Sequence, residues 1–392
     1  MQTPNHLYLR LSSLAVFRHL LEMPLVRAFM RYCEADALSA KLSAYGEFVS
    51  EIYRHGGDLT AFVKTAVFED ENVYITSAAI GESCPSALEE AKENELSALE
   101  SFATMTPEDF RKDMGYDGFL PKYTFSPVSL SAEYAERVRN VGRYGYGIFA
   151  SHGMFRLSDE GKIEPILSAD PIALSSFVGY EHERKQVIDN TEAFLLGRPA
   201  ANILLYGDAG TGKSSTVKAV SNAFFDRGIR LIEIRKDQLA SLPYVMGQIS
   251  KNPLHFIIFI DDLSFLQSDD SFSMLKAALE GSASAKAKNA VIYATSNRRH
   301  IVKESFSDRD VGDDLHRNDT VQETLSLSER FGLCILFAKP SQKLYLDIVF
   351  ELADKYNIQL PKERLRTEAE AFALRRGYRS ARCAEQFIES LL

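Results

Sequence analysis

The sequence predicts an α/β fold in which a parallel five-stranded sheet carries a phosphate-binding loop. Two observations support this fold class. Short apolar stretches alternate with helical patterns in the second half of the chain, at residues 203–206, 229–234, 256–260, 290–294 and 333–338. Such strands are typical of a parallel sheet covered by helices on both faces. The second observation is the glycine-rich segment 207–214, which directly follows the first of these strands.

This segment, GDAGTGKS, has the spacing G-x-x-x-x-G-K-[ST] of a phosphate-binding loop. Its glycines let consecutive backbone N–H groups turn inward around an anion, and the helix that follows points its positive dipole end at the phosphates. Lysine can reach the terminal phosphates, and the serine hydroxyl can ligate Mg²⁺. The predicted nucleotide-binding residues are Gly207, Asp208, Ala209, Gly210, Thr211, Gly212, Lys213, Ser214 and Ser215.

Composition excludes several classes of protein. The chain has 392 residues, of which 45% are hydrophobic and 25% charged, as in ordinary globular proteins. No apolar run is long enough to cross a membrane, and the first residues lack the layout of a signal peptide. The four cysteines lie far apart, which is typical of buried thiols in a reducing compartment, so we expect a cytoplasmic protein. The net charge of −9 disfavours a broad nucleic-acid surface.

Residues 1–135 are predicted to form a mainly helical N-terminal domain. Apolar residues recur at helical spacing over Leu7–Met30, Leu38–Tyr53 and Ser86–Met105. Thr106, followed by Pro107, has the pattern of a helix start. This region contains no recognisable site, so we expect a structural or partner-binding role.

The remaining chain divides into three predicted parts. Residues 136–172 form a small β-hairpin and a linker, with a turn at residues 159–161. Residues 173–340 form the nucleotide-binding core, in which the acidic segment Lys303–Glu323 is predicted to be a solvated loop. Residues 341–392 contain three helical patterns and are predicted to form a C-terminal lid subdomain.

Two carboxylates, Asp261 and Asp262, end the buried strand at residues 256–260. Ligands of such sheets bind beyond the carboxyl ends of the strands, where the phosphate loop also lies. We predict that Asp261 holds Mg²⁺ through its waters, together with Ser214, and that Asp262 orients or deprotonates a hydrolytic water.

Three further polar positions are candidates for catalysis or nucleotide sensing. Asn297 ends the strand at residues 290–294 and can position the attacking water. Arg330 precedes the last strand, from where a guanidinium can reach the γ-phosphate bound by a neighbouring subunit. Arg382 or Arg379, at the start of the last helix, can fold over the nucleotide from the lid; Arg382 is the preferred candidate.

Taken in this order, these elements resemble the AAA+ ATPases. From about Ser176 to Ile388, segments such as FVGYEHER, FIIFIDDLSF, KAALEG, YATSNRRH, LSLSERFG and RSARCAEQF are similar to the bacterial AAA+ family catalogued as domain of unknown function 815. The N-terminal region also resembles that family, with weaker motifs.

The resemblance implies ATP and Mg²⁺ bound at a subunit interface of a homo-oligomeric ring or partial ring. It also implies that Val178, Gly179 and Tyr180 border the adenine, that Asp262 is the catalytic carboxylate, and that Arg330 is an arginine finger in trans. Most AAA+ proteins have glutamate at the position of Asp262, so the shorter aspartate predicts slow hydrolysis or a repositioned water.

Three functions fit these predictions. The preferred one is an ATP-hydrolysing machine that remodels a protein client; the alternatives are a low-turnover nucleotide switch or scaffold, and a nucleic-acid-associated loader. The acidic balance disfavours the loader. Residues 242–245, LPYV, lack the aromatic–aliphatic–Gly triplet of many threading pores, so the sequence leaves threading, the client and the oligomer number open.

Overall fold

The computed structural model describes residues 3–168, 171–263, 265–266, 274–275, 279, 287–297, 302–303 and 330–392. The chain forms two compact units, Met1–Ser151 and His152–Leu392. The predicted division at residues 135, 172 and 340 is finer than this and stays a prediction. Among the described residues, no helix is both long enough and apolar enough to cross a membrane.

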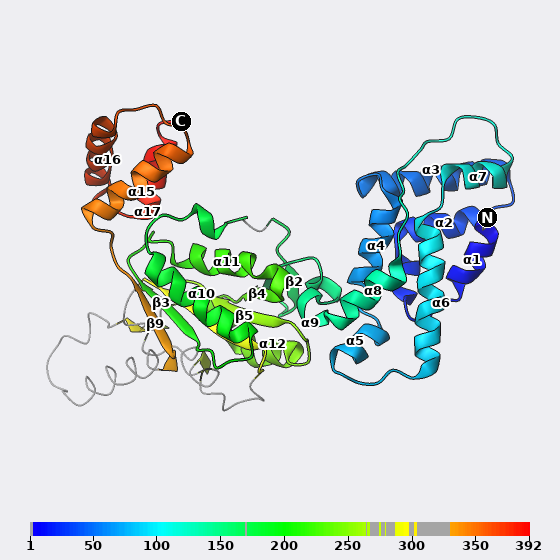
Figure 1. Ribbon diagram of the computed structural model, residues 1–392, viewed down its shortest axis with the longest axis horizontal. Helices are drawn as coiled ribbons and strands as arrows, with labels where there is room; N and C mark the ends of the chain where they lie inside the picture. The colour runs from blue at the N-terminus through cyan, green and yellow to red at the C-terminus, as the bar shows by residue number, and fades with distance from the viewer. Residues whose placement is uncertain are drawn as a thin grey trace. The chain divides into compact units, whose positions relative to one another are not determined.

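The first unit is helical, as predicted (Figure 1). Its helices are short and amphipathic, so their apolar faces must pack on one another to be stable. Their bounds are α1 Pro4–Ser12, η1 Arg18–Glu22, α2 Pro24–Glu34, α3 Leu38–Arg54, α4 Leu59–Glu69, α5 Val73–Ala79, α6 Ser86–Ala103, α7 Pro107–Met114, α8 Leu130–Arg139, α9 Val141–Tyr144 and η2 Gly147–Phe149.

Aromatic side chains form the centre of this unit. The ring of Phe29 on α2 lies 6.2 Å from Phe48 on α3, 5.0 Å from Phe102 on α6 and 6.2 Å from Phe110 on α7, measured between centroids. The tilted and edge-on ring geometries favour such contacts. Four helices therefore meet at one aromatic cluster. The predicted start of α7 is confirmed, because the Thr106 side chain accepts a hydrogen bond from the N–H of Asp109.

The single helix predicted over Leu7–Met30 is divided into α1, η1 and α2. Pro24 takes the first position of α2, where its missing N–H costs nothing. In the break, the backbone N–H groups of Ala15, Val16 and Phe17 donate to the carboxylate of Glu95 on α6, at 2.8–3.1 Å. This long-range contact satisfies backbone groups that a continuous helix would have paired locally.

The second unit is built on a seven-stranded sheet in the order β2-β1-β4-β5-β7-β3-β9. All neighbouring strands are parallel except β1 and β2, which are antiparallel. The strands are β1 Met154–Leu157, β2 Ile163–Pro165, β3 Ile203–Gly207, β4 Ile229–Glu233, β5 His255–Ile260, β7 Ala290–Ser296 and β9 Leu333–Phe337. A separate pair joins β6 Phe265–Leu266 to β8 Val302–Lys303.

The predicted α/β fold class with a helical lid is confirmed, but the strand count of five is wrong. The predicted hairpin forms as β1 and β2, and β1 pairs with β4, so the hairpin adds two strands to the sheet. Hydrophobic alternation reveals a hairpin but not the edge on which it docks, because docking depends on partners distant in sequence.

Helices cover both faces of the sheet (Figure 1). Apolar side chains of α10 (Glu181–Leu195) and α11 (Lys213–Ala223) form one buried cluster with inward residues of the strands, Leu205 and Phe259 among them. The alternate strand residues, such as Leu204 and Ile258, are fully buried as well. Helix α12 (Leu242–Ile249) contributes buried residues from the chain between β4 and β5. Burial on both faces explains the continuous apolar strands of the sequence.

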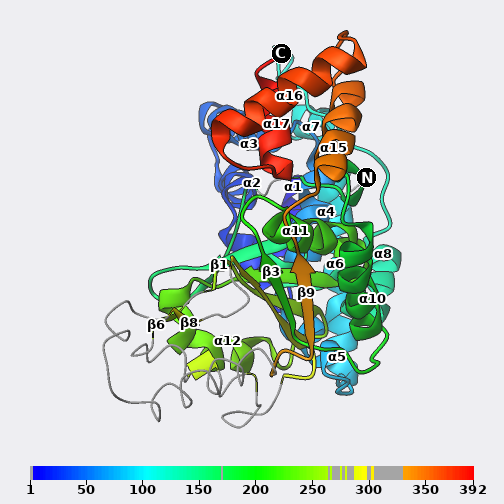
Figure 2. The same cartoon turned by 90° about the vertical axis from the view of Figure 1, so that its left-hand side faces the viewer.

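Three helices follow β9 and form the lid: α15 Gln342–Lys355, α16 Lys362–Arg376 and α17 Ala381–Glu389. They share a hydrophobic core that includes Tyr345 and Phe387. Figure 2 shows β9 beside β3 at the sheet edge, with the chain continuing from β9 into α15. The lid therefore begins at the sheet edge next to the phosphate-loop strand.

Candidate nucleotide-binding site

The phosphate loop joins β3 to α11, and its glycines take conformations that side chains disfavour. Gly207, Gly210 and Gly212 have φ angles of 134°, 75° and 89°. A Cβ atom on Gly207 would lie 2.1 Å from the carbonyl oxygen of Phe337 on β9. Glycine is therefore required here for both backbone conformation and space. The first turn of α11 offers N–H groups at this loop, as an anion-binding site needs.

Lys213, the first residue of α11, is held at the mouth of the loop. Its ammonium group donates to the carbonyl oxygens of Gly207 (3.0 Å) and Asp208 (2.7 Å) and to the side-chain oxygen of Asn297 (3.1 Å). Burial lowers the pKa of Lys213, whereas the neighbouring carboxylates of the site oppose that shift. A buried cation among oxygen acceptors is suited to binding a phosphate.

Asp261 lies where a Mg²⁺-binding carboxylate is expected. Its Oδ1 atom accepts hydrogen bonds from the hydroxyls of Ser214 (2.6 Å) and Thr295 (2.5 Å). Ser214 comes from the phosphate loop, Asp261 from the end of β5 and Thr295 from β7. The predicted metal pair, Ser214 and Asp261, is thus brought into direct contact.

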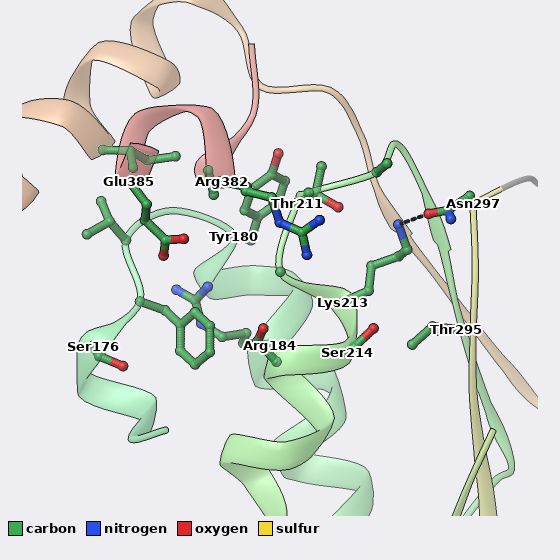
Figure 3. A pocket seen from close by; sticks show the side chains of 18 of the residues that line it. Ser176, Tyr180, Arg184, Thr211, Lys213, Ser214, Thr295, Asn297, Arg382 and Glu385 are labelled. Carbon is green, nitrogen blue, oxygen red and sulfur yellow. Dashed lines mark hydrogen bonds between the residues drawn. The ribbon is translucent and has the colours of Figure 1, made fainter. Parts of the chain in front are cut away.

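Asn297 connects the phosphate lysine to the second carboxylate. Its side-chain oxygen accepts from Lys213 (Figure 3), and its amide nitrogen donates to Oδ1 of Asp262 at 2.7 Å. The sheet order explains this bridge, because β7 lies between β3 and β5 and so ends between their two loops. Asp262 has a left-handed backbone with φ of 50°, an uncommon conformation for a residue other than glycine.

These residues line a pocket of about 330 Å³. Of the predicted nucleotide-binding residues, the structure places Val178, Tyr180, residues 209–215 and Arg382 in its wall, together with Asp261, Asp262 and Asn297. Asp208 lines a neighbouring cavity, and its carboxylate accepts from the N–H of Lys339. Gly207 is not in the pocket wall; it begins the loop, where its backbone packs against Phe337 on β9.

The segment before α10 contacts both the sheet and the lid. Gly179 has a φ of 74°, and a Cβ atom there would lie 2.6 Å from Cδ1 of Leu344 on α15. The Tyr180 ring stacks on Phe337 with centroids 5.3 Å apart, and its hydroxyl donates to the carbonyl of Ala338 at 2.6 Å. Burial raises the pKa of Tyr180 to about 12, so the hydroxyl stays a donor at neutral pH.

The lid presents Arg382, rather than Arg379, to this pocket. The backbone N–H of Arg382 donates to the carbonyl of Gly210 at 3.2 Å, and its side chain lines the pocket. Arg379 instead pairs with Glu370 on α16 at 2.8 Å. The geometry favours Arg382 as the lid arginine because its side chain lines this pocket, whereas Arg379 is not in the pocket wall and lines the neighbouring cavity.

Arg330 is not in the wall of this pocket. It precedes β9, whose first residue, Leu333, pairs with Ile203 at the start of β3, whereas Phe337 pairs with Gly207 at the phosphate loop. Arg330 thus lies at the end of β9 that is distant from the nucleotide pocket of its own chain. Its role in trans stays a prediction.

The residues fit ATP and Mg²⁺. Left-handed glycines, a helix N-terminus and a buried lysine match the needs of phosphates, and the Ser214–Asp261 pair matches a hard cation that keeps several waters. Among the described residues, no group of three or more His, Cys, Asp or Glu side chains could hold a metal by itself.

Sequence reasoning missed several residues of the pocket. Thr295, Arg184 and Glu385 line it, as do the apolar side chains of Ile348 and Leu352 on α15. Thr295 had a signal, since it lies on β7 two residues before Asn297, which directly follows that strand, and alternate residues share a face. Most of the predicted loop 303–323, the KAALEG segment except Leu279, and residues 325–329 lie outside the described residues.

Comparisons with known proteins place the chain in a family. Among solved structures, it resembles the Holliday junction branch migration motor RuvB from Thermotoga maritima, with 14% identity over 56% of this chain and 72% of that one and a TM-score of 0.34. It also resembles the replication initiator DnaA, which was bound to AMPPCP and single-stranded DNA, with 18% identity over 57% and 66% of the two chains and a TM-score of 0.39. No curated protein matches the chain. The family model described as "Protein of unknown function (DUF815)" matches residues 150–392, and the chain belongs to that family.

Proposed function

We propose that this protein is an AAA+ ATPase that binds ATP with Mg²⁺, hydrolyses it, and uses the cycle to remodel a protein partner. One observation carries the proposal: Asn297 bridges the phosphate lysine and the candidate catalytic carboxylate, next to the Ser214–Asp261 pair. A phosphate-binding site that only stored nucleotide would not need a carboxylate and an amide converging beside its lysine.

Each residue has a distinct task in this proposal. When bound, Mg²⁺ neutralises part of the phosphate charge. Lys213 binds the terminal phosphates, and Arg382 contributes a second positive charge from the lid. Asp262 accepts a proton from the attacking water, and the amide of Asn297 fixes the position of that carboxylate. Arg330 acts on the nucleotide of a neighbouring subunit in a homo-oligomer.

The helical N-terminal unit supports a protein client. It exposes large apolar side chains, among them Phe119 (84% exposed) and Leu9 (66%). Aromatic side chains such as Phe are enriched at protein-binding surfaces. The net charge of −9 favours a protein client over nucleic acid.

A low-turnover switch is the second candidate, favoured by a specific contact. One oxygen of Asp262 already accepts the hydrogen bond from Asn297, so fewer of its lone pairs are open to an attacking water. The two candidates differ in turnover number and agree in nucleotide binding.

Steady-state hydrolysis and equilibrium binding of ATP test the proposal together. Asp262→Asn should bind Mg·ATP as the wild type does and hydrolyse it at least about a hundredfold more slowly, because general-base catalysis contributes about 10²–10⁴-fold. Lys213→Ala should lose binding altogether. Lys218→Ala is the matched control, since Lys218 lies on the same helix and pairs with Glu233 instead.

Undiminished hydrolysis by Asp262→Asn would contradict the role of Asp262 as general base. Tight ATP binding by Lys213→Ala would contradict the assignment of the phosphate loop. Slow wild-type turnover with intact binding selects the switch. Stimulation of hydrolysis by DNA but by no protein fraction would select a nucleic-acid loader.

A further inference from the structure

The nucleotide pocket extends well beyond the phosphate loop. Lys213, Ser214 and Asn297 lie at one end, and Ser176, Arg184 and Glu385 lie toward the other (Figure 3). If the phosphates occupy the lysine end, as in the proposed function, the base must occupy the far end. The Phe177 ring lies under the Arg184 guanidinium at that end, and the other apolar residues of the pocket wall include Val178, before α10, and Ile348 and Leu352, from the lid. Apolar walls of this kind suit a flat aromatic base.

Arg184, on α10, has more hydrogen-bond donors than partners. Its side chain is only 9% exposed, and its guanidinium lies over the Phe177 ring, 5.2 Å from the centroid. Among the described residues its one hydrogen-bond partner is Glu181, at 3.5 Å, and the side chain of Glu181 is itself 77% exposed. Burial lowers the pKa of Arg184, which reflects the cost of placing this charge where water is scarce. A buried guanidinium with one long contact is suited to a ligand acceptor.

Glu385, on α17, projects into the same part of the pocket. It lies one helical turn after Arg382, so both side chains lie on the face of α17 that meets the core. Within the described part of the chain, its carboxylate makes no hydrogen bond and no ion pair, with Arg184 or any other residue. Desolvation raises the pKa of Glu385, and Glu389 adds to this, whereas Arg382 and Lys355 oppose it. The site thus holds an acceptor and a donor that line one pocket and are not paired with each other.

We propose that Glu385 and Arg184 read the edge of the base and make the pocket selective for adenine, an inference that rests on the proposed nucleotide site. Adenine presents an amino donor, N6–H₂, beside a ring-nitrogen acceptor. The carboxylate of Glu385 accepts from N6–H₂, and the guanidinium of Arg184 donates to the ring nitrogen. A 6-oxo purine has a carbonyl oxygen where adenine has the amino group. That oxygen faces the carboxylate oxygen of Glu385, and the hydrogen bond to Glu385 is lost.

The test compares two nucleotides that differ only at this edge. ADP and inosine diphosphate carry the same ribose and phosphates, so their dissociation constants in Mg²⁺ buffer, measured by calorimetry, isolate the base. The wild type should bind ADP about 10–100-fold more tightly, as expected for a hydrogen bond to a charged group. Glu385→Ala should weaken ADP binding by about that factor and should not weaken the binding of inosine diphosphate.

Two further variants sharpen the comparison. Glu385→Gln keeps a side-chain oxygen that can accept from N6–H₂, so part of the preference for ADP should survive. Glu351→Ala is the matched control, because Glu351 is an exposed carboxylate on α15 of the lid and is not in the pocket wall. Its preference should equal that of the wild type.

Each outcome has a defined meaning. Equal affinity of the wild type for the two nucleotides, or a preference for GDP, overturns the assignment of adenine. If Glu385→Ala weakens the binding of both nucleotides equally, the carboxylate acts on the ribose or on lid closure. That result also overturns the assignment of Glu385 to adenine. Both results leave the proposed ATPase intact, whereas absence of any nucleotide binding by the wild type would contradict the proposed function itself.

Discussion

Several hydrogen bonds constrain the side chain of Asp261. One of its oxygens accepts two hydroxyl hydrogen bonds, from Ser214 and Thr295, which hold the carboxylate beside the phosphate loop. A third donor, the backbone N–H of Asp262, lies 3.1 Å from the same oxygen. These contacts orient the carboxylate before any cation arrives, and such preorganisation reduces the cost of binding.

Asp261→Asn should therefore raise the Mg²⁺ concentration needed for half-maximal ATP hydrolysis by about 10–100-fold. The amide removes the negative charge that favours the cation but keeps the size of the side chain. Titrating Mg²⁺ at saturating ATP measures the shift. Asp189→Asn, at an exposed pair with Lys185 on α10, should leave the titration unchanged; an unchanged curve for Asp261→Asn would contradict its role at the metal.

At the scale of elements, the phosphate loop depends on how closely β3 approaches β9. The backbones pair along their whole length, and Gly207 pairs with Phe337 where the loop begins. No side chain fits at this position because the Phe337 carbonyl occupies the space. The loop is therefore shaped by the neighbouring strand as well as by its own glycines.

Gly207→Ala should destabilise the protein by about 2–4 kcal/mol and weaken nucleotide binding, because strain at a special backbone conformation adds to a steric clash. Thermal denaturation and ADP binding measure the two effects. Gly247→Ala is the contrasting variant. Gly247 is within α12, and among the described residues beyond its own helix backbone and chain neighbours no atom lies within 4 Å of an added Cβ, so alanine there should stabilise by about 0.5–1 kcal/mol. Equal stability of Gly207→Ala and Gly247→Ala would contradict the close approach of Phe337 to Gly207.

The N-terminal unit depends on a comparable long-range contact. Glu95 is buried and its carboxylate satisfies three consecutive backbone N–H groups in the break between α1 and α2. Removing it leaves these donors without a protein partner, and each buried unsatisfied group costs about 1–3 kcal/mol.

Glu95→Ala should lower the free energy of unfolding of this unit by about 3 kcal/mol or more. Hydrogen exchange should increase first at residues 13–23, where the donors lie. Glu90→Ala, at an exposed position on the same helix, should change stability by less than about 0.5 kcal/mol. Unaltered exchange in Glu95→Ala would show that the carboxylate does not hold the break.

At the scale of the whole molecule, the location of Arg330 bears on assembly. Within one chain it lies at the end of β9 opposite the phosphate loop, where it cannot reach its own nucleotide. A catalytic arginine at this position acts only on the nucleotide of a second copy of the chain. A shared active site therefore predicts that ATPase activity depends on protein concentration.

Specific ATPase activity should rise with protein concentration, and Arg330→Ala should lose about 10³-fold or more of it, as expected for an arginine finger. Mixing Arg330→Ala with Lys213→Ala should restore part of the activity, because each variant supplies the residue that the other lacks. Activity independent of concentration, with Arg330→Ala like the wild type, would exclude the finger in trans.

The sequence by itself determined the parts of this protein whose signals are local. The spacing around Lys213, the paired carboxylates after β5 and the apolar strands each follow from neighbouring residues, and the structure brings Lys213, Asp261, Asp262 and Asn297 to one edge of the sheet. Parallel strands make this foreseeable, because their carboxyl ends meet at the same edge.

Only the tertiary structure decided the features that depend on distant partners. The hairpin became part of the sheet because β4 offered an open edge, and the helix predicted over residues 7–30 was divided because Glu95 pairs with the backbone between its parts. Arg184 and Glu385, 201 positions apart in the chain (385 − 184), line one pocket because the lid folds back over the core. Local periodicity carries no information about such contacts, since their energy comes from groups that the chain brings together only on folding.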